Sequence, residues 1–215
     1  MKIICLGDSQ TFSYGLHRAD KWTTLLGEAT GFEVINAGIN GDTSGGMLAR
    51  LRYDVIDQKP DVVMVMGGGN DFIMGCSLEI VKANFMAIVQ QCLAAKIRVF
   101  AASELLVYPE LVNPEYKKLA DFDEVNRKLY DFGRWLPDFC NTFPGVEFID
   151  LQNQYLDAAE GGLKYSADGL HPTKEGAKIV AKICKSVNVP IPPYTPSPIK
   201  KKKLPMHLHL LGKII

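Results

Sequence analysis

Short apolar runs alternate along this chain with longer segments of helical period, and this alternation constrains the fold more than any other feature. The pattern is typical of an α/β protein with a parallel sheet. The run Val62-Val-Met-Val-Met66 is apolar at every position, which indicates a central strand covered by helices on both faces. The sequence therefore predicts a single doubly wound α/β domain of three layers, built on a five-stranded parallel sheet.

Apolar periodicity and turn residues predict where the elements begin and end. Strands are expected at Lys2–Gly7, Glu33–Asn36, Asp61–Met66, Arg98–Ala102 and Val146–Ile149. Helices are expected at Lys21–Ala29, Ser44–Gln58, Leu78–Ala95, Glu115–Trp135 and Thr173–Ser186. Pro137 is expected to end the fourth of these helices, because proline has no backbone N–H to continue the hydrogen-bond ladder. Pro144-Gly145 is expected to turn the chain into the fifth strand.

Length and composition predict one domain and a short extension. The chain has 215 residues, of which 47% are hydrophobic, and this suits one globular core. Residues 1–189 are expected to form the domain, because the alternating pattern is complete within them. Residues 190–215 are rich in proline and lysine and are expected to form a C-terminal extension. Its apolar end, Leu204–Ile215, could remain in solvent, pack on the domain, or join a second copy in a homo-oligomer.

The charge distribution and the cysteines indicate where the protein is located and which partners it binds. Five of the 24 basic residues and none of the 24 acidic residues lie in positions 190–215, so the remainder is net acidic and nucleic acid is not an expected partner. The first apolar run is too short for a signal peptide, and no run approaches the ~18 residues of a membrane span. Five cysteines without a C-x-x-C pair suit a reducing compartment. A cytoplasmic location is expected.

Three residues that can form an activated nucleophile occur in the order serine, aspartate, histidine. Ser9 follows the first expected strand, and ligands of open parallel sheets bind beyond the carboxyl ends of strands. Asp168 and His171 share one short turn, so the carboxylate can bind one imidazole nitrogen while the other takes the serine proton. Ser9 could instead only cap a helix. No Gly-x-Ser-x-Gly motif is present, which excludes the nucleophile elbow of another hydrolase class.

Two glycine-rich blocks lie between these residues. Asn36-Ala-Gly-Ile-Asn-Gly-Asp-Thr43 follows the second expected strand, and Gly68-Gly-Asn-Asp71 follows the third. Each block alone could be an ordinary strand-to-helix turn. Because both are expected at the sheet edge that carries Ser9, they indicate one site. We interpret Asp8 and Asp71 as hydrogen-bond partners that brace these loops.

The four blocks, in this order, resemble the SGNH, or GDSL, family of serine esterases and lipases. The resemblance runs from Met1 to about Val187 and implies a flavodoxin-like strand order. It also implies ester hydrolysis through an acyl-serine intermediate. Gln10 stands where the family name has leucine, and no catalytic role is expected for it.

The resemblance assigns a role to each matching residue. Ser9 is implied as the nucleophile, His171 as the base and Asp168 as the residue that orients the base. The oxyanion hole is implied at the backbone N–H groups of Ser9 and Gly41 and at the side-chain amide of Asn70. A hydrolase of this type needs no cofactor. No metal site is expected either, since the His207-x-His209 pair at the chain end has no third ligand.

The substrate class stays open between two kinds of ester. The second block and Leu48–Leu51 look most like the bacterial thioesterase/lysophospholipase branch, which implies small to medium acyl esters and thioesters. A carbohydrate acetylesterase of the same superfamily would share every catalytic residue. Ser103–Tyr116 is expected to line the pocket, and its apolar residues favour acyl chains. The remaining alternative is a doubly wound binding module without turnover.

Overall fold

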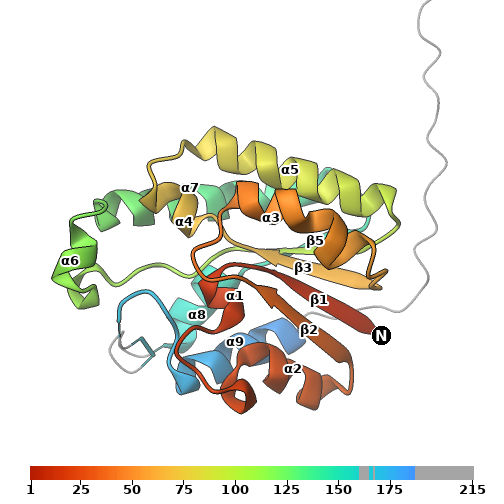
Figure 1. Cartoon of the computed structure of the whole chain (residues 1–215), viewed down its shortest axis with the longest axis horizontal. Helices are drawn as coiled ribbons and strands as arrows, with labels where there is room; N and C mark the ends of the chain where they lie inside the picture. Colours follow the sequence, from red (N-terminus) through yellow and green to blue (C-terminus); the bar gives the residue numbers. More distant parts are fainter. Residues whose placement is uncertain (160–164, 167, 187–215) are drawn as a thin grey trace, which may run out of the picture.

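The computed structural model describes residues 1–159, 165, 166 and 168–186. Within them, one sheet contains the strands β1 (Lys2–Gly7), β2 (Glu33–Gly38), β3 (Val62–Met66), β4 (Arg98–Ala102) and β5 (Val146–Ile149). All neighbouring strands are parallel, in the order β2-β1-β3-β4-β5 (Figure 1). This is the flavodoxin-like order. The predicted fold class is therefore confirmed, and the predicted strands match within two residues.

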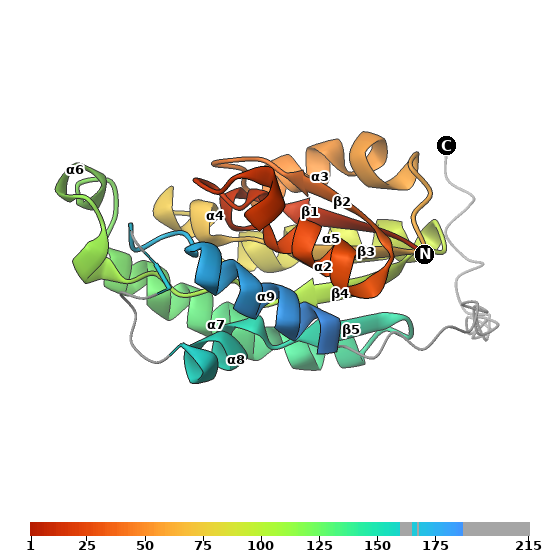
Figure 2. The ribbon, with the colours of Figure 1, turned by 90° about the horizontal axis from the view of Figure 1, so that it is seen from below.

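Helices cover both faces of the sheet, as the apolar third strand requires (Figures 1 and 2). One face carries α3 (Ser44–Leu51), α5 (Leu78–Ala94) and α7 (Phe122–Asn141). The other face carries α2 (Trp22–Thr30), α8 (Leu151–Ala158) and α9 (Lys174–Ser186). Three short helices lie near the carboxyl ends of the strands: α1 (Ser9–Phe12), α4 (Gly69–Ile73) and α6 (Pro114–Lys117).

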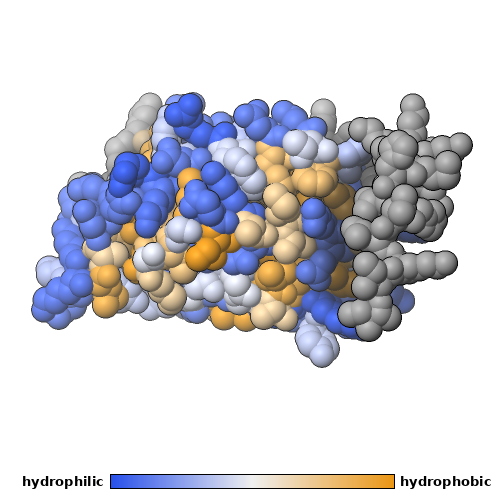
Figure 3. Space-filling model, turned by 90° about the horizontal axis from the view of Figure 1, so that it is seen from above, coloured by the Kyte–Doolittle hydropathy of each residue, from blue (hydrophilic) through white to orange (hydrophobic). Residues whose placement is uncertain are grey.

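Alternate residues of each central strand supply two cores. In β1, Ile4 and Leu6 belong to the core beneath α3, α5 and α7, whereas Ile3 and Cys5 belong to the core beneath α2 and α9. Each fully buried aliphatic side chain of this kind contributes about 1.5–3 kcal/mol. Seen from the side of α3 and α5, the surface is mixed: hydrophilic residues prevail toward the left, and hydrophobic residues gather in the middle and toward the right (Figure 3).

The helix predicted at Glu115–Trp135 is wrong in its extent. The chain forms α6 and α7 as separate helices, because the side chain of Asp121 accepts hydrogen bonds from the N–H groups of Asp123 and Glu124 and begins a new helix there. Pro137 does not end α7, which continues to Asn141. Proline inside a helix costs about 3 kcal/mol, and burial of Leu136, Phe139 and Cys140 on either side of it offsets that cost.

The predicted helix Ser44–Gln58 is divided as well. It consists of α3 followed by a π-helical turn, η2 (Arg52–Ile56). None of the helices in the described part of the chain is long and apolar enough to cross a membrane. The extension at 190–215, with its histidine pair and its proposed oligomer contact, lies outside the described residues.

Candidate active site

The candidate site lies at the topological switch point of the sheet, where the strand order reverses between β1 and β3, at the carboxyl ends of these two strands. Ser9 is the first residue of α1, immediately after the turn that leaves β1. That turn needs glycine at position 7, because a Cβ there would lie 2.4 Å from the carbonyl oxygen of Met66 in β3. The close approach of the two strands thus puts Ser9 beside the loop that follows β3. Ligands of doubly wound sheets bind at this point.

Ser9, His171 and Asp168 form a continuous hydrogen-bonded chain. His171 Nε2 lies 2.9 Å from Ser9 Oγ, and His171 Nδ1 lies 2.7 Å from Asp168 Oδ2. With Nδ1 donating to the carboxylate, Nε2 is the nitrogen that can accept the serine proton. The ring of Tyr14 packs against the imidazole at 4.8 Å between ring centres. The three residues predicted from the sequence are therefore brought together in a geometry that can activate a hydroxyl group.

The turn that carries Asp168 and His171 is fixed by its own backbone. Asp168 Oδ1 accepts hydrogen bonds from the N–H groups of Leu170 and His171 at 2.9 and 2.8 Å. Partial burial acts to raise the pKa of Asp168, but the hydrogen bonds from the imidazole and the two N–H groups outweigh it and lower the pKa to about 2. Gly169 has a φ of +81° and packs against Tyr108, where a Cβ would lie 2.5 Å from the carbonyl oxygen. Because its pKa is lowered to about 2, Asp168 is ionised at neutral pH.

Gln10 connects the serine turn to two other loops. Its side-chain oxygen accepts from the N–H of Leu105 at 3.1 Å, and its Nε2 lies 3.3 Å from the carbonyl oxygens of Leu105 and Leu170. The side chain is buried, so each polar atom has a protein partner. The residue that departs from the family name thus positions Ser9 against the loop of His171. No structural role had been predicted for it.

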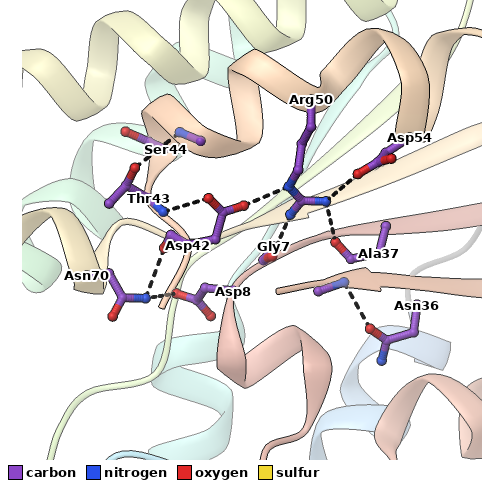
Figure 4. Close-up of polar contacts among 12 residues, drawn as sticks. Gly7, Asp8, Asn36, Ala37, Asp42, Thr43, Ser44, Arg50, Asp54 and Asn70 are labelled. Atoms are coloured by element: carbon purple, nitrogen blue, oxygen red, sulfur yellow. Dashed lines mark hydrogen bonds and ion pairs between the residues drawn. The ribbon is translucent and has the colours of Figure 1, made fainter. Parts of the chain in front are cut away.

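The loop of Gly41 is held by an arginine that the sequence analysis did not single out (Figure 4). Arg50, in α3, pairs with Asp42 at 2.7 Å and with Asp54 at 2.9 Å. It also donates to the carbonyl oxygens of Gly7 at 2.9 Å and Ala37 at 2.8 Å. One side chain therefore ties the ends of β1 and β2 to the loop between β2 and α3. Gly41 itself has a φ of +75°, a conformation that favours glycine.

Short helix α4 supplies Asn70 and Asp71, which hold the loop between β2 and α3 at two points. The amide of Asn70 donates to the carbonyl oxygen of Asp42 at 2.9 Å and to Asp8 Oδ2 at 3.3 Å (Figure 4). Asp71 accepts from the backbone N–H and the hydroxyl group of Ser44 at 2.7 and 2.6 Å. The bracing role predicted for Asp8 and Asp71 agrees with these contacts.

A pocket of about 470 Å³ opens over these residues. Its lining includes Ser9, Gly41, Asn70, Asp168 and His171, so every predicted site residue reaches it. The apolar part of the lining consists of Ile73, Val107, Val112, Leu129 and Leu170. The segment expected to line the pocket contributes Val107 and Val112.

The same segment also supplies residues with other roles. Leu105 is buried in the core beneath α2 and α9 and does not line the pocket. The segment also brings Glu104 to the pocket, a buried carboxyl group that the sequence analysis missed. The sequence does indicate this residue by its position, because Glu104 comes shortly after β4, just as Ser9 comes after β1 and Asn70 after β3. Among the described residues, no group of three His, Cys, Asp or Glu side chains is arranged to hold a metal ion.

The fold and the site define a serine hydrolase built on a doubly wound, flavodoxin-like domain, with a serine hydroxyl, an imidazole and a carboxylate in line. The chain belongs to the GDSL-like lipase/acylhydrolase family, whose sequence model matches residues 5–179. The protein is thus a hydrolase that acts on ester bonds.

Characterised relatives cover most of the chain. Esterase TesA of Pseudomonas aeruginosa is 33% identical over 180 residues, 79% of each chain. Thioesterase 1/protease 1/lysophospholipase L1 of Escherichia coli K12 is 28% identical over 187 residues, 83% of this chain and 79% of the relative. An acetylxylan esterase of Geobacillus stearothermophilus is 28% identical over 156 residues, 71% of this chain and 70% of the relative.

A solved structure shows the same fold. The crystal structure of a lipolytic G-D-S-L family protein from Veillonella parvula superposes with a TM-score of 0.74 at 20% identity. The match covers 87% of this chain and 97% of that one. The likeness therefore extends over the whole sheet and its helical layers.

Proposed function

We propose that the protein is a serine acylhydrolase that cleaves esters or thioesters of small to medium acyl chains. The observation that carries the proposal is the hydrogen-bonded chain from Asp168 through His171 to Ser9, which ends at the mouth of a largely apolar pocket. The nucleophile thus meets the substrate at the point where its acyl chain enters.

The reaction proceeds in two halves through a covalent intermediate. Ser9 Oγ attacks the carbonyl carbon while its proton passes to His171 Nε2. The imidazolium formed is stabilised by Asp168 and returns the proton to the departing alcohol or thiol, which leaves Ser9 acylated. Water then attacks the acyl group, gives its proton to His171, and the carboxylic acid departs as Ser9 regains its proton.

Three donors are proposed to hold the negative charge of each tetrahedral intermediate. Within the described part of the chain, the backbone N–H groups of Ser9 and Gly41 have no protein acceptor and so can bind an oxyanion. The third donor is the amide of Asn70, whose bond to Asp42 is short and whose bond to Asp8 is long. The oxyanion takes the hydrogen that Asp8 holds weakly. Each such donor lowers the activation free energy by roughly 2.7–4 kcal/mol.

The apolar pocket wall supports acyl chains as the recognised group. Burying one methylene contributes about 0.8 kcal/mol, which is roughly a fourfold gain in kcat/KM. We therefore expect kcat/KM to rise along a series of para-nitrophenyl esters from acetate upward until the pocket is full, and then to fall. Matched acyl-thioesters test the leaving group. A Ser9→Ala variant, assayed in parallel, subtracts any hydrolysis that does not use the site.

Polar residues on the pocket rim favour a second candidate, a carbohydrate acetylesterase. Asn40, Asn113 and Glu115 line the mouth and can bind hydroxyl groups, and one relative is named as an acetylxylan esterase. Acetylated xylo-oligosaccharides belong in the same substrate panel. A kcat/KM for these sugars above that of every acyl ester in the series would replace the acyl-chain proposal with this one.

A further inference from the structure

A buried pair of carboxyl groups lies directly behind the proposed oxyanion donors. Asp8 is 1% exposed and Glu104 is 4% exposed, both line the pocket, and their carboxyl groups lie close enough for each to change the pKa of the other. Two ionised carboxylates buried side by side would repel each other and could not hydrogen-bond, because each can only accept. A single proton shared between the two groups relieves both penalties.

The surroundings place that proton on Glu104. Asp8 accepts from the N–H of Gln10 at 2.9 Å and from the amide of Asn70 at 3.3 Å, and both bonds favour its ionised form. Glu104 accepts one bond besides, at 2.6 Å from the N–H of Gly69. Burial raises the pKa of Glu104 well above its ordinary value, and the neighbouring charge of Asp8 raises it further.

The charged groups that act on Glu104 are themselves acidic, so they disfavour its ionised form. Asp71, in α4, also raises the pKa of Glu104. Burial raises the pKa of Asp8 and Asp42 adds to this, whereas the hydrogen bond from Glu104 and the charge of His171 lower it. Among the residues described, neither carboxyl group forms an ion pair with lysine or arginine.

The pair contacts two parts of α4 that bear on the oxyanion site. Glu104 accepts a hydrogen bond from the first N–H of the helix, and it lies so close that a Cβ at position 69 would be 2.8 Å from Glu104 Oε1. Asp8 holds one of the two amide hydrogens of Asn70, the other being held by Asp42. The hydrogen that must turn to the oxyanion is therefore the one that Asp8 binds.

We propose that Glu104 is a positioning residue that shares one proton with Asp8, and that hydrolysis requires this proton to be present. The proposal rests on the serine hydrolase function above. With Glu104 protonated, Asp8 has a donor of its own and releases Asn70 to the oxyanion. When the proton is lost to solvent, two negative charges face each other beside the oxyanion site. They repel one another, strengthen the hold of Asp8 on Asn70 and oppose the developing charge.

The test is the alkaline limb of the pH profile, measured with para-nitrophenyl acetate in a pH-stat. Wild-type kcat should fall about tenfold per pH unit above the midpoint, the slope of a single lost proton. Glu104→Gln keeps a neutral donor of the same shape that cannot titrate. It should hold neutral-pH kcat within about threefold of wild type and lose the alkaline limb. Glu79→Gln, the same change at an exposed position in α5 outside the pocket lining, should keep the limb.

Two results with the variant would each overturn the proposal: an alkaline limb that persists unchanged in Glu104→Gln, or a folded Glu104→Gln protein whose kcat is already down about a hundredfold at neutral pH. Infrared difference spectra of the wild type supply a measurement that needs no variant. A protonated carboxyl band should be present at neutral pH and disappear in step with activity, and absence of that band also overturns the proposal. Because the band is measured without substrate, and Ser9→Ala tests hydrolysis separately, failure of this inference is distinguishable from failure of the proposed function.

Discussion

The imidazole of His171 lies within 2.9 Å of the Ser9 hydroxyl group although 162 positions separate the two residues in the sequence. The contact is held from three sides: Asp168 binds the ring, Tyr14 packs on it, and Gln10 joins the two loops. Because all three supports come from the protein itself, the nucleophile is preorganised. Little reorganisation is then needed when the substrate binds.

Ser9→Ala should lower kcat on the order of 10⁴–10⁶-fold while the protein stays folded. The hydroxyl group takes part in the chemistry, and its removal leaves no buried polar group without a partner except an imidazole nitrogen that can meet water. Circular dichroism and turnover of an aryl ester check both parts. An organophosphonate should label the wild type once per chain, at Ser9, and retention of more than about a tenth of wild-type turnover would exclude the serine mechanism.

Asn70→Ala should lower kcat on the order of 10²–10³-fold with a smaller change in KM. The amide meets charge that exists only in the transition state, so its loss raises the barrier more than it weakens binding. Steady-state kinetics separate the two constants. A rise in KM at constant kcat would instead make Asn70 a substrate-binding residue.

Arg50→Ala should lower the free energy of unfolding by about 3 kcal/mol, because it leaves Asp42 and two carbonyl oxygens without their partner in a largely buried place. The Gly41 loop should loosen at the same time and kcat should fall. Arg52→Ala is the matched control. Arg52 pairs with Asp57 at 3.7 Å in solvent and should change the free energy of unfolding by less than about 1 kcal/mol. Urea denaturation of both variants measures the two changes in the free energy of unfolding. Equal losses would contradict the structural role assigned to Arg50.

Asp168→Asn should remove a pH-dependent part of the stability. The pKa of Asp168 is lowered from 3.8 to about 2 in the folded protein, so ionisation stabilises the fold at pH values above the unfolded value. That contribution is lost as pH falls through the folded value. We expect wild type to be more stable than Asp168→Asn at neutral pH and the difference to shrink as the pH falls toward 2. Urea denaturation measures the free energy of unfolding of both proteins. A difference that stays constant over this pH range would show that folding does not lower the pKa of Asp168.

Deletion of residues 190–215 should leave an active domain, because every described strand, helix and core residue precedes position 187. Light scattering and ester turnover of the full and shortened chains provide the check. Equal size and equal kcat support a separate extension. A change from oligomer to monomer on deletion would support the alternative proposal, in which the apolar end joins two copies of the chain.

Sequence reasoning was most accurate where a local pattern carries the information. The apolar runs predicted β1, β4 and β5 to the residue, and the triad blocks predicted the residues that meet at the sheet edge. It was least accurate where burial competes with propensity. Pro137 was expected to end a helix, but its apolar neighbours hold the helix together. Asp121, a helix-capping residue, was overlooked inside a segment predicted as continuous helix.

The sequence by itself determined the order of the elements, the class of fold and the residues that form the hydrolytic chain, because each depends on periodicity or on residues close together in a turn. Only the tertiary structure decided which side chains support them. Arg50, Gln10 and Glu104 look like ordinary polar residues in the sequence, and their partners lie on other loops. A buried polar group takes its role from the donors and acceptors that surround it, and packing brings those together from distant parts of the chain.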